Sequence, residues 1–216
     1  MPPDHRLVSE RFPRSSQYHP AWLLANASGG ANSLWLTEWL TTALELRPGM
    51  RVGVIGLGGL GMTAARLAVL GGAEVYAAEI NEQVHEAALE RGVKHVVNDV
   101  RELAPYDLEL IADFAGFGTT TAGAIEVIAD GGRVVQVGLG QAESTINTQL
   151  LTLKQLDLVG SLGGTPEDTV EVINFLASGD LRIATKSLGF DEIPSGLDIL
   201  KRGAAEGQRF VADVRP

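Results

Sequence analysis

The sequence predicts an α/β fold in which a doubly wound parallel sheet is covered by helices on both faces. Strand-like apolar runs alternate with helix-like runs from residue 51 onward, which is typical of βαβ crossovers. The first of these runs leads directly into a glycine-rich turn that opens a helix. The chain has 216 residues, of which 45% are hydrophobic and 20% charged, so it can bury a substantial core.

Three short apolar runs predict the first half of the sheet. Residues 51–55 and 74–78 are expected to be strands, and residues 95–97 a shorter one. Helices are predicted over residues 59–71 and 82–91, where apolar side chains recur at helical spacing. These helices would carry the crossovers between successive strands.

The second half of the sheet is predicted from strands over residues 108–114, 133–137 and 156–161. Helices are expected over residues 119–129 and 166–177, and the second of these starts in a Thr-Pro-Glu-Asp capping sequence. Because βαβ crossovers are right-handed, a doubly wound sheet is the natural topology for this series.

The composition argues against several kinds of partner and site. The 27 Asp and Glu residues outnumber the 17 Lys and Arg, and a net charge of −10 argues against nucleic acid or an anionic membrane as a partner. There is no cysteine, and the four histidines show no metal-ligand spacing, so no metal site is expected. With no membrane-spanning run and no apolar signal core, the expected location is cytoplasmic.

A G-x-G-x-x-G motif directly follows the first predicted strand. Gly56 permits a tight turn, Gly58 lets a pyrophosphate approach the backbone, and Gly61 allows the helix to lie close to the sheet. The N–H groups that open the helix, around Gly59 and Leu60, would face the phosphates. This context predicts a Rossmann-type dinucleotide-binding site. The alternative is that the glycines only make a tight strand–helix turn.

Glu79 is the expected ribose ligand, because it ends the second strand roughly 20 residues after the glycine motif. A carboxylate at this place accepts hydrogen bonds from the 2′- and 3′-hydroxyls of the adenosine. It would repel a 2′-phosphate, so NAD(H) is favoured over NADP(H) as the cofactor.

Six blocks of the sequence occur together in one order: VGVIGLGGLGMTAARLA, VYAAEINEQVHEAALERGVKHVVND, DFAGFG, GGRVVQVGLG, LDLVGSLGGTPED and FDEIPSGLDILKRG. From about residue 52 on, they resemble the medium-chain dehydrogenase/reductase family, of the zinc-type alcohol dehydrogenase kind. The resemblance implies hydride transfer between a nicotinamide and an alcohol or carbonyl carbon. It also implies a homodimer that forms through the sheet edge near residues 156–160.

The resemblance implies further contacts with the two halves of the cofactor. Ala115 and Gly116 would lie along the adenosine side, and Arg209 would reach the pyrophosphate. Positions just past the carboxyl ends of the later strands would lie near the nicotinamide, since such positions line the ligand crevice. These positions are Val137, Gly138, Leu139, Ser161 and Leu162.

The sequence also departs from the family pattern. The half that normally precedes this region supplies the zinc ligands and much of the substrate pocket, and nothing here replaces it. We therefore expect a zinc-free cofactor-binding domain, for which a separate catalytic partner is one possibility. No residue of the chain is assigned as a catalytic acid or base.

Three segments are expected along the chain: an N-terminal arm and helix over residues 1–50, a dinucleotide-binding domain over 51–180, and a returning segment over 181–216. In the arm, apolar side chains at helical spacing predict a helix over residues 33–45.

The returning segment is expected to contain strands over residues 183–188 and 210–214 and a helix over 193–202. Without their usual partner, these strands would expose unpaired edges. The segment would then pack loosely, or pair with the N-terminal arm or another chain.

Two other functions stay open. Residues 10–52 carry RFPRSSQYHPAWLLANASGG, LWLTEWL and LRPGMRV, and resemble the N-terminal arm of class I S-adenosylmethionine-dependent methyltransferases. The glycine loop argues against that cofactor, because no carboxylate ends the first strand and S-adenosylmethionine has no pyrophosphate. The third possibility is a module that binds a dinucleotide, or a partner, without catalysis.

Overall fold

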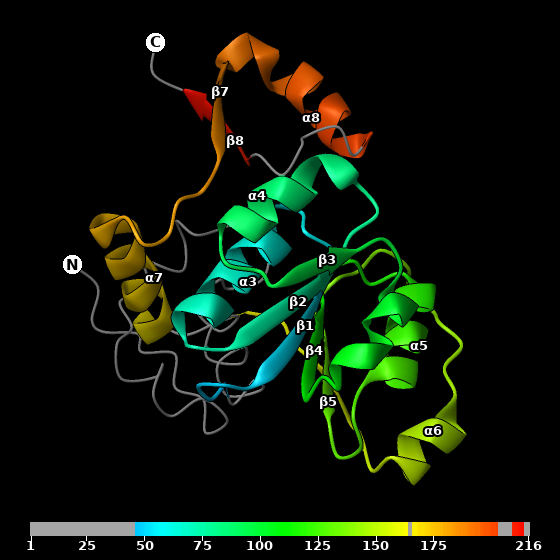
Figure 1. Cartoon of the computed structure of the whole chain (residues 1–216). Coiled ribbons are helices and arrows are strands. Elements are labelled where there is room, and N and C mark those ends of the chain that lie inside the picture. Colours follow the sequence, from blue (N-terminus) through cyan, green and yellow to red (C-terminus); the bar gives the residue numbers. More distant parts are fainter. Residues whose placement is uncertain (1–45, 164–165, 203–208, 214–216) are drawn as a thin grey trace, which may run out of the picture.

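The structure of the chain is a computed structural model that describes residues 46–163, 166–202 and 209–213 (Figure 1). The helix predicted over residues 33–45 lies outside the described residues. The same is true of most of the arm that resembles methyltransferases.

Six parallel strands form the main sheet in the order β3-β2-β1-β4-β5-β6. The strands are β1 Arg51–Ile55, β2 Glu74–Ala78, β3 His95–Val97, β4 Leu110–Asp113, β5 Arg133–Gln136 and β6 Asp157–Gly160. The chain winds outward in one direction from β1 to β3 and in the other from β4 to β6. This confirms the predicted doubly wound Rossmann-type sheet and places its switch point between β1 and β4.

Helices cover both faces of this sheet, as Figure 1 shows. The α-helices of this domain are α3 Gly59–Leu70, α4 His85–Glu90, α5 Gly118–Val127, α6 Thr148–Leu153 and α7 Pro166–Ser178. Side chains of β1 and β2, such as Val54 and Val75, pack against α3 and α4 on one face. On the other face, Ile111 and Val134 pack with Ile125 of α5. The central strands are therefore buried on both sides, which explains their nearly continuous apolar sequence.

Most predicted elements lie within three residues of the observed bounds. The missed ones are short: a 3₁₀ helix of three residues over Phe190–Glu192, and two elements of the main domain. The first is α6, whose six residues are too short for a clear helical period and whose start depends on Asn147 accepting a hydrogen bond from the Leu150 N–H. The second is a 3₁₀ helix over Val100–Tyr106, held by a capping box between Asp99 and Glu102. Both are set by local caps rather than by an apolar pattern.

A second, two-stranded sheet lies beside the main one. It consists of β7 Thr185–Gly189 and β8 Arg209–Asp213, which run parallel, with α8 Ile193–Lys201 between them in the chain. The strands of the returning segment pair with each other, and among the described residues neither pairs with a further strand, so each keeps the open edge that was expected. Both strands are largely exposed, and their partly buried side chains are Leu188, Phe210 and Ala212.

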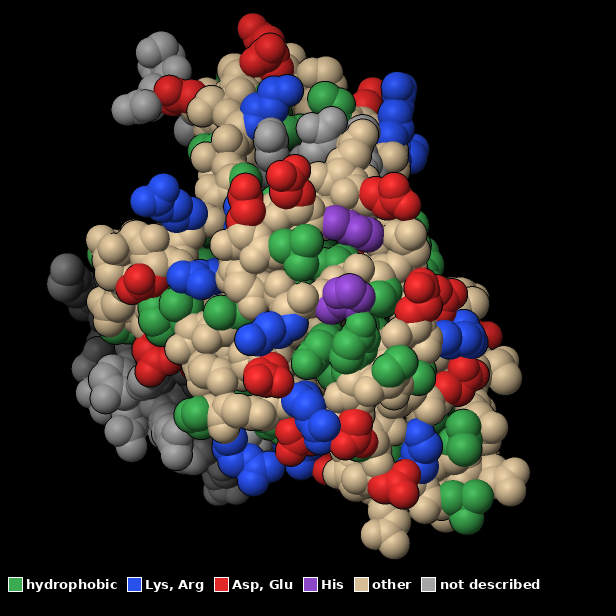
Figure 2. Space-filling view, in the orientation of Figure 1, with side chains coloured by type: hydrophobic (Ala, Val, Ile, Leu, Met, Phe, Trp, Pro, Cys, Tyr) green, Lys and Arg blue, Asp and Glu red, His purple; other side chains and the backbone are tan. Residues whose placement is uncertain are grey.

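The described residues include no helix that is long and apolar enough to cross a membrane. On the face drawn in Figure 2, acidic and basic side chains are interspersed rather than separated by sign.

Candidate functional site

The glycine loop between β1 and α3 adopts a conformation that side chains would prevent at two positions. Gly56 has a φ of +83°, and a Cβ there would lie 3.1 Å from the backbone nitrogen of Ala115. A Cβ at Gly61 would overlap the carbonyl oxygen of Gly56. Glycine at these two positions therefore lets α3 start directly against the end of β1.

The N-terminus of α3 offers backbone N–H groups for which the described part of the chain supplies no acceptor. No side chain caps this end, and its first turn carries no acidic residue. The first helical bond in the loop runs from the Met62 N–H to the Gly58 carbonyl, so the preceding N–H groups have no partner within the helix. A Cβ at Gly58 would point into open space. The partial positive charge of a 12-residue helix is thus presented to a cleft.

Glu79 lies just beyond β2 and is oriented by two backbone groups. Its Oε2 accepts a hydrogen bond from the Leu57 N–H at 2.6 Å, and its Oε1 accepts one from the Asn81 N–H at 2.8 Å. The carboxylate thereby ties the glycine loop to the end of β2. Because each oxygen can accept a further bond, the fixed carboxylate can also receive the hydroxyl groups of a ligand.

These features share one cleft of about 690 Å³ at the carboxyl edge of the sheet. The size suits an extended organic ligand. Its floor is the loop from Gly56 to Gly61, with Glu79 and Ala115 beside it. The remaining wall is mainly apolar and comes from both the sheet and the C-terminal unit: Ile80, Val84, Phe114, Phe117, Leu200 and Phe210.

Arg209 brings a positive charge to the same cleft from the first residue of β8. Its guanidinium lies 3.2–3.4 Å from the point where a Cβ on Gly59 would be, so it extends across the first turn of α3. Within the described residues, no carboxylate forms an ion pair with it. The guanidinium and the free helix N–H groups therefore converge on one place suited to a phosphate.

Eight of the residues predicted from the sequence line this cleft: Gly56, Gly58, Gly59, Leu60, Gly61, Glu79, Ala115 and Arg209. The other six do not line it. They follow β4, β5 and β6 at the same edge: Gly116, Val137, Gly138, Leu139, Ser161 and Leu162. Their contacts with a cofactor stay predictions.

Two of these six have distinctive surroundings. Ser161 is 6% exposed, and among the described residues its hydroxyl has no hydrogen-bond partner, which is unusual for a buried polar group. Leu139, by contrast, is 86% exposed just beyond β5. The Ser161 hydroxyl and the exposed Leu139 side chain thus both lie where the resemblance implies the nicotinamide.

Sequence reasoning missed the apolar wall of the cleft. Ile80 directly follows the predicted ribose ligand, so its position in the chain was an available signal. Leu200 and Phe210 come from the C-terminal unit, and no local pattern indicates that they reach the glycine loop.

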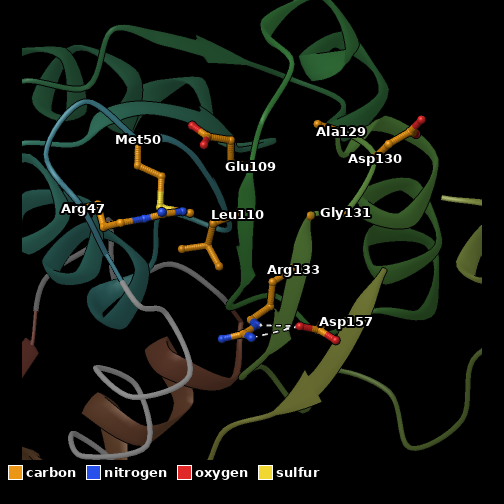
Figure 3. A pocket seen from close by; sticks show the side chains of 10 residues that line it. Arg47, Met50, Glu109, Leu110, Ala129, Asp130, Gly131, Arg133 and Asp157 are labelled. Carbon is orange, nitrogen blue, oxygen red and sulfur yellow. Dashed lines mark hydrogen bonds and ion pairs between the residues drawn. The ribbon is translucent and has the colours of Figure 1, made fainter. Parts of the chain in front are cut away.

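A second pocket, of about 210 Å³, lies at the opposite, amino edge of the sheet (Figure 3). Arg133 and Asp157 form an ion pair of 2.9 Å there. The N–H groups of Gly131 and Gly132 are bonded to backbone carbonyls, so they offer no cradle for an anion. The carboxyl-edge cleft is therefore the better candidate site.

The two described histidines have structural contacts rather than a place in the cleft. His85 Nε2 lies 2.7 Å from the Glu79 carbonyl oxygen, and the His95 ring packs near Tyr106. Within the described part of the chain, no group of three or more His, Cys, Asp or Glu side chains is arranged to hold a metal ion.

Comparison with known proteins identifies the family. The family model described as zinc-binding dehydrogenase matches residues 59–178. The chain belongs to this family. The match confirms the resemblance carried by the sequence blocks, and it spans the region from the glycine loop to the end of α7.

Relatives of this chain agree with it in sequence and fold. An uncharacterized zinc-type alcohol dehydrogenase-like protein of Haemophilus influenzae is 30% identical over 197 residues, which cover 82% of this chain and 57% of that protein. The structure of acetophenone reductase from Geotrichum candidum in complex with NAD is similar with a TM-score of 0.76 and 25% identity, over 84% of this chain and 53% of the reductase.

The alcohol dehydrogenase of the archaeon Aeropyrum pernix is similar with a TM-score of 0.71 and 27% identity. That match covers 79% of this chain and 52% of the archaeal enzyme. The chain thus spans about half the length of the relatives that it matches.

The two glycines of the loop should respond differently to alanine. Gly61→Ala should lower the free energy of unfolding by about 1–3 kcal/mol, because the new methyl group overlaps the Gly56 carbonyl. Gly58→Ala should leave stability unchanged or raise it by about 0.4–1 kcal/mol, since Gly58 has a φ of −63° and space around it. Urea denaturation of both variants measures this difference. Equal destabilisation by both would contradict the structure of the loop.

Proposed function

We propose that the carboxyl-edge cleft binds NAD(H) and that the protein serves as an oxidoreductase of the medium-chain alcohol dehydrogenase type. One observation carries this proposal. The free N–H groups of α3, the Glu79 carboxylate and the Arg209 guanidinium, which come from three distant parts of the sequence, converge on a single cleft. These groups match a pyrophosphate flanked by a ribose.

The cleft fits the parts of the dinucleotide in order. Glu79 would accept hydrogen bonds from the adenosine ribose, and Ile80 and Val84 would contact the adenine. The pyrophosphate would lie between the start of α3 and Arg209. In a doubly wound sheet each half binds one mononucleotide, so the nicotinamide would lie over the ends of β4, β5 and β6. There the unpartnered Ser161 hydroxyl could bond to its carboxamide.

The charges at the adenosine end favour NAD(H) over NADP(H). Glu79 is followed by Ile80, Asn81, Glu82 and Gln83, so the turn after β2 carries a second carboxylate and no Lys or Arg. A 2′-phosphate would meet like charge at this place, which disfavours binding.

The bound cofactor would supply the hydride chemistry, which belongs to its nicotinamide ring. The part of this chain that the structure describes would bind the cofactor and orient its nicotinamide ring at the carboxyl edge of the sheet. The apolar wall of the cleft would exclude water from the bound cofactor. The described residues of the cleft include no His, Tyr or Lys placed to donate a proton to a substrate. We propose that the pocket for an alcohol or carbonyl substrate is completed by groups outside these residues, on this chain or on a catalytic partner.

The methyltransferase alternative is less well supported by the cleft. The positive end of α3 and Arg209 provide for a phosphate, which S-adenosylmethionine lacks. β1 ends in Val54 and Ile55, without the acidic residue that its amino-acid moiety would use. A dinucleotide-binding module without catalysis would use the same cleft. It would differ from the proposed oxidoreductase only in having no turnover.

A parallel titration tests the cofactor. Calorimetry of the purified chain with NADH, NADPH and S-adenosylmethionine should show saturable NADH binding, tighter than NADPH binding by about tenfold or more. Preferential binding of S-adenosylmethionine would replace the proposal with the methyltransferase function. A folded sample that binds none of the three would refute dinucleotide binding.

Glu79 should account for much of the affinity and for the preference between cofactors. Glu79→Ala should weaken NADH binding by about ten- to hundredfold, since it removes a charged hydrogen-bonding group, and should narrow the gap to NADPH. Glu74→Ala is the matched control, because Glu74 is an exposed glutamate at the other end of the same strand. Unchanged NADH affinity in Glu79→Ala would rule out the ribose contact.

We also propose a homodimer through β6. This strand is an edge of the main sheet and, among described residues, pairs with β5 alone, while Leu158 on it is partly exposed. Light scattering should give twice the chain mass of 22.9 kDa. Leu158→Lys should give the monomer mass, because a charge on an edge strand opposes pairing. Leu153→Lys, on the exposed face of α6, is the control and should stay dimeric. A monomeric wild type would exclude this dimer.

A further inference from the structure

A fully buried carboxylate ends β4 at the sheet's switch point. Asp113 Oδ1 accepts hydrogen bonds from the N–H groups of Ala115 and Gly116, at 3.0 and 2.9 Å. Its Oδ2 lies 2.8 and 2.9 Å from the hydroxyls of Thr120 and Thr121 at the start of α5. The carboxylate therefore shapes the turn that brings Ala115 to the cleft, although Asp113 itself does not line it.

From Asp113 the contacts continue to the end of the neighbouring strand. The Thr121 hydroxyl lies 2.9 Å from Asp113 Oδ2 and 2.7 Å from Gln136 Oε1, and it can donate its single proton to either of these acceptors. Gln136, the last residue of β5, donates from Nε2 to the Gly138 carbonyl at 2.7 Å. The backbone carbonyl of Asp113 also accepts from the N–H groups of Val137 and Gly138. The turns after β4 and β5 are thus joined by one continuous network.

The two turns also touch directly. A Cβ on Gly116 would overlap the Gly138 carbonyl, and Gly116 has a φ of +64°. A Cβ on Gly138 would lie 2.5 Å from the Phe114 carbonyl oxygen. Such close backbone packing leaves the turns no room to shift independently, so a change in the network at one turn displaces the other.

We propose that Asp113, Thr121 and Gln136 are positioning residues that set the nicotinamide end of the cofactor site. The inference rests on the proposed function, because it assigns the second half of the dinucleotide to the turns that this network holds. The turn after β4 contributes Ala115 to the cleft, while the turn after β5 carries Val137 to Leu139. By joining them, the network aligns the two halves of the site across the switch point.

Thr121 is the link that can be removed with the least change of shape. Thr121→Val keeps the side-chain volume but deletes the hydroxyl that bridges Asp113 and Gln136, whereas Thr121→Ser keeps the hydroxyl. Thr119→Val is the matched control, because Thr119 is an exposed threonine in the first turn of the same helix. The Thr120 hydroxyl is not a suitable control, because it lies 2.8 Å from Asp113 Oδ2 and belongs to the same network.

The experiment compares NADH with ADP-ribose, which lacks the nicotinamide, by calorimetry on the full chain. Thr121→Val should weaken NADH binding by about five- to tenfold and leave ADP-ribose binding within about twofold. The shift in nicotinamide fluorescence on binding should shrink in parallel. Thr121→Ser should keep both values near those of the wild type, and Thr119→Val should change neither by more than about twofold.

The outcomes separate this inference from the proposed function. If wild type binds neither ligand, the proposed function fails and the inference fails with it. If wild type binds both, and Thr121→Val binds NADH as tightly as wild type, the inference alone is overturned. Equal weakening of NADH and ADP-ribose would also overturn it, because the network would then have only a general structural role. Should Thr121→Val not fold, Gln136→Leu removes the same link at a half-buried position and is judged by the same criteria.

Discussion

The close approach of α3 to the end of β1 is the constraint on which the rest of the site depends. Any Cβ at position 61 would overlap the Gly56 carbonyl. Because Gly61 has none, α3 can begin directly after β1, with its N-terminus at the carboxyl edge of the sheet. Only at this distance do the unpaired N–H groups of the first turn border the same cleft as Glu79. A helix set further from the strand would direct the same dipole into solvent, where it has little effect.

Two carboxylates then organise the two halves of the edge in different ways. Glu79 remains half-buried, fixes the glycine loop through the Leu57 N–H, and keeps acceptor capacity for a ligand. Asp113 is fully buried and directs its bonds inward, to two backbone N–H groups and two hydroxyls. In the proposed function, Glu79 would face the ligand and Asp113 would hold the turns beside it, so the two carboxylates would have a binding role and a positioning role on either side of the switch point.

The C-terminal unit gives the cleft its positive charge and part of its apolar wall. Arg209 lies about 150 residues after the glycine loop in the chain, yet its guanidinium crosses the first turn of α3. Leu200 and Phe210 come with it. Because β7 and β8 form their own small, largely exposed sheet, this unit depends on few buried contacts. A ligand held between α3 and Arg209 would therefore join the unit to the main sheet.

The sequence by itself determined the order and type of the main elements, because buried parallel strands and the glycine turn leave patterns within a few residues of chain. It also identified Gly56, Gly61 and Glu79 as candidate site residues, since their spacing reflects local geometry. It did not indicate α6 or the 3₁₀ helix after β3, which depend on single capping bonds. Arg209 was found through family resemblance alone. Only the tertiary structure decided three features: the place of the Arg209 guanidinium over Gly59, the network from Asp113 to Gly138, and the pairing of β7 with β8. Each of them joins groups that are distant in the chain or fixed by the packing around them.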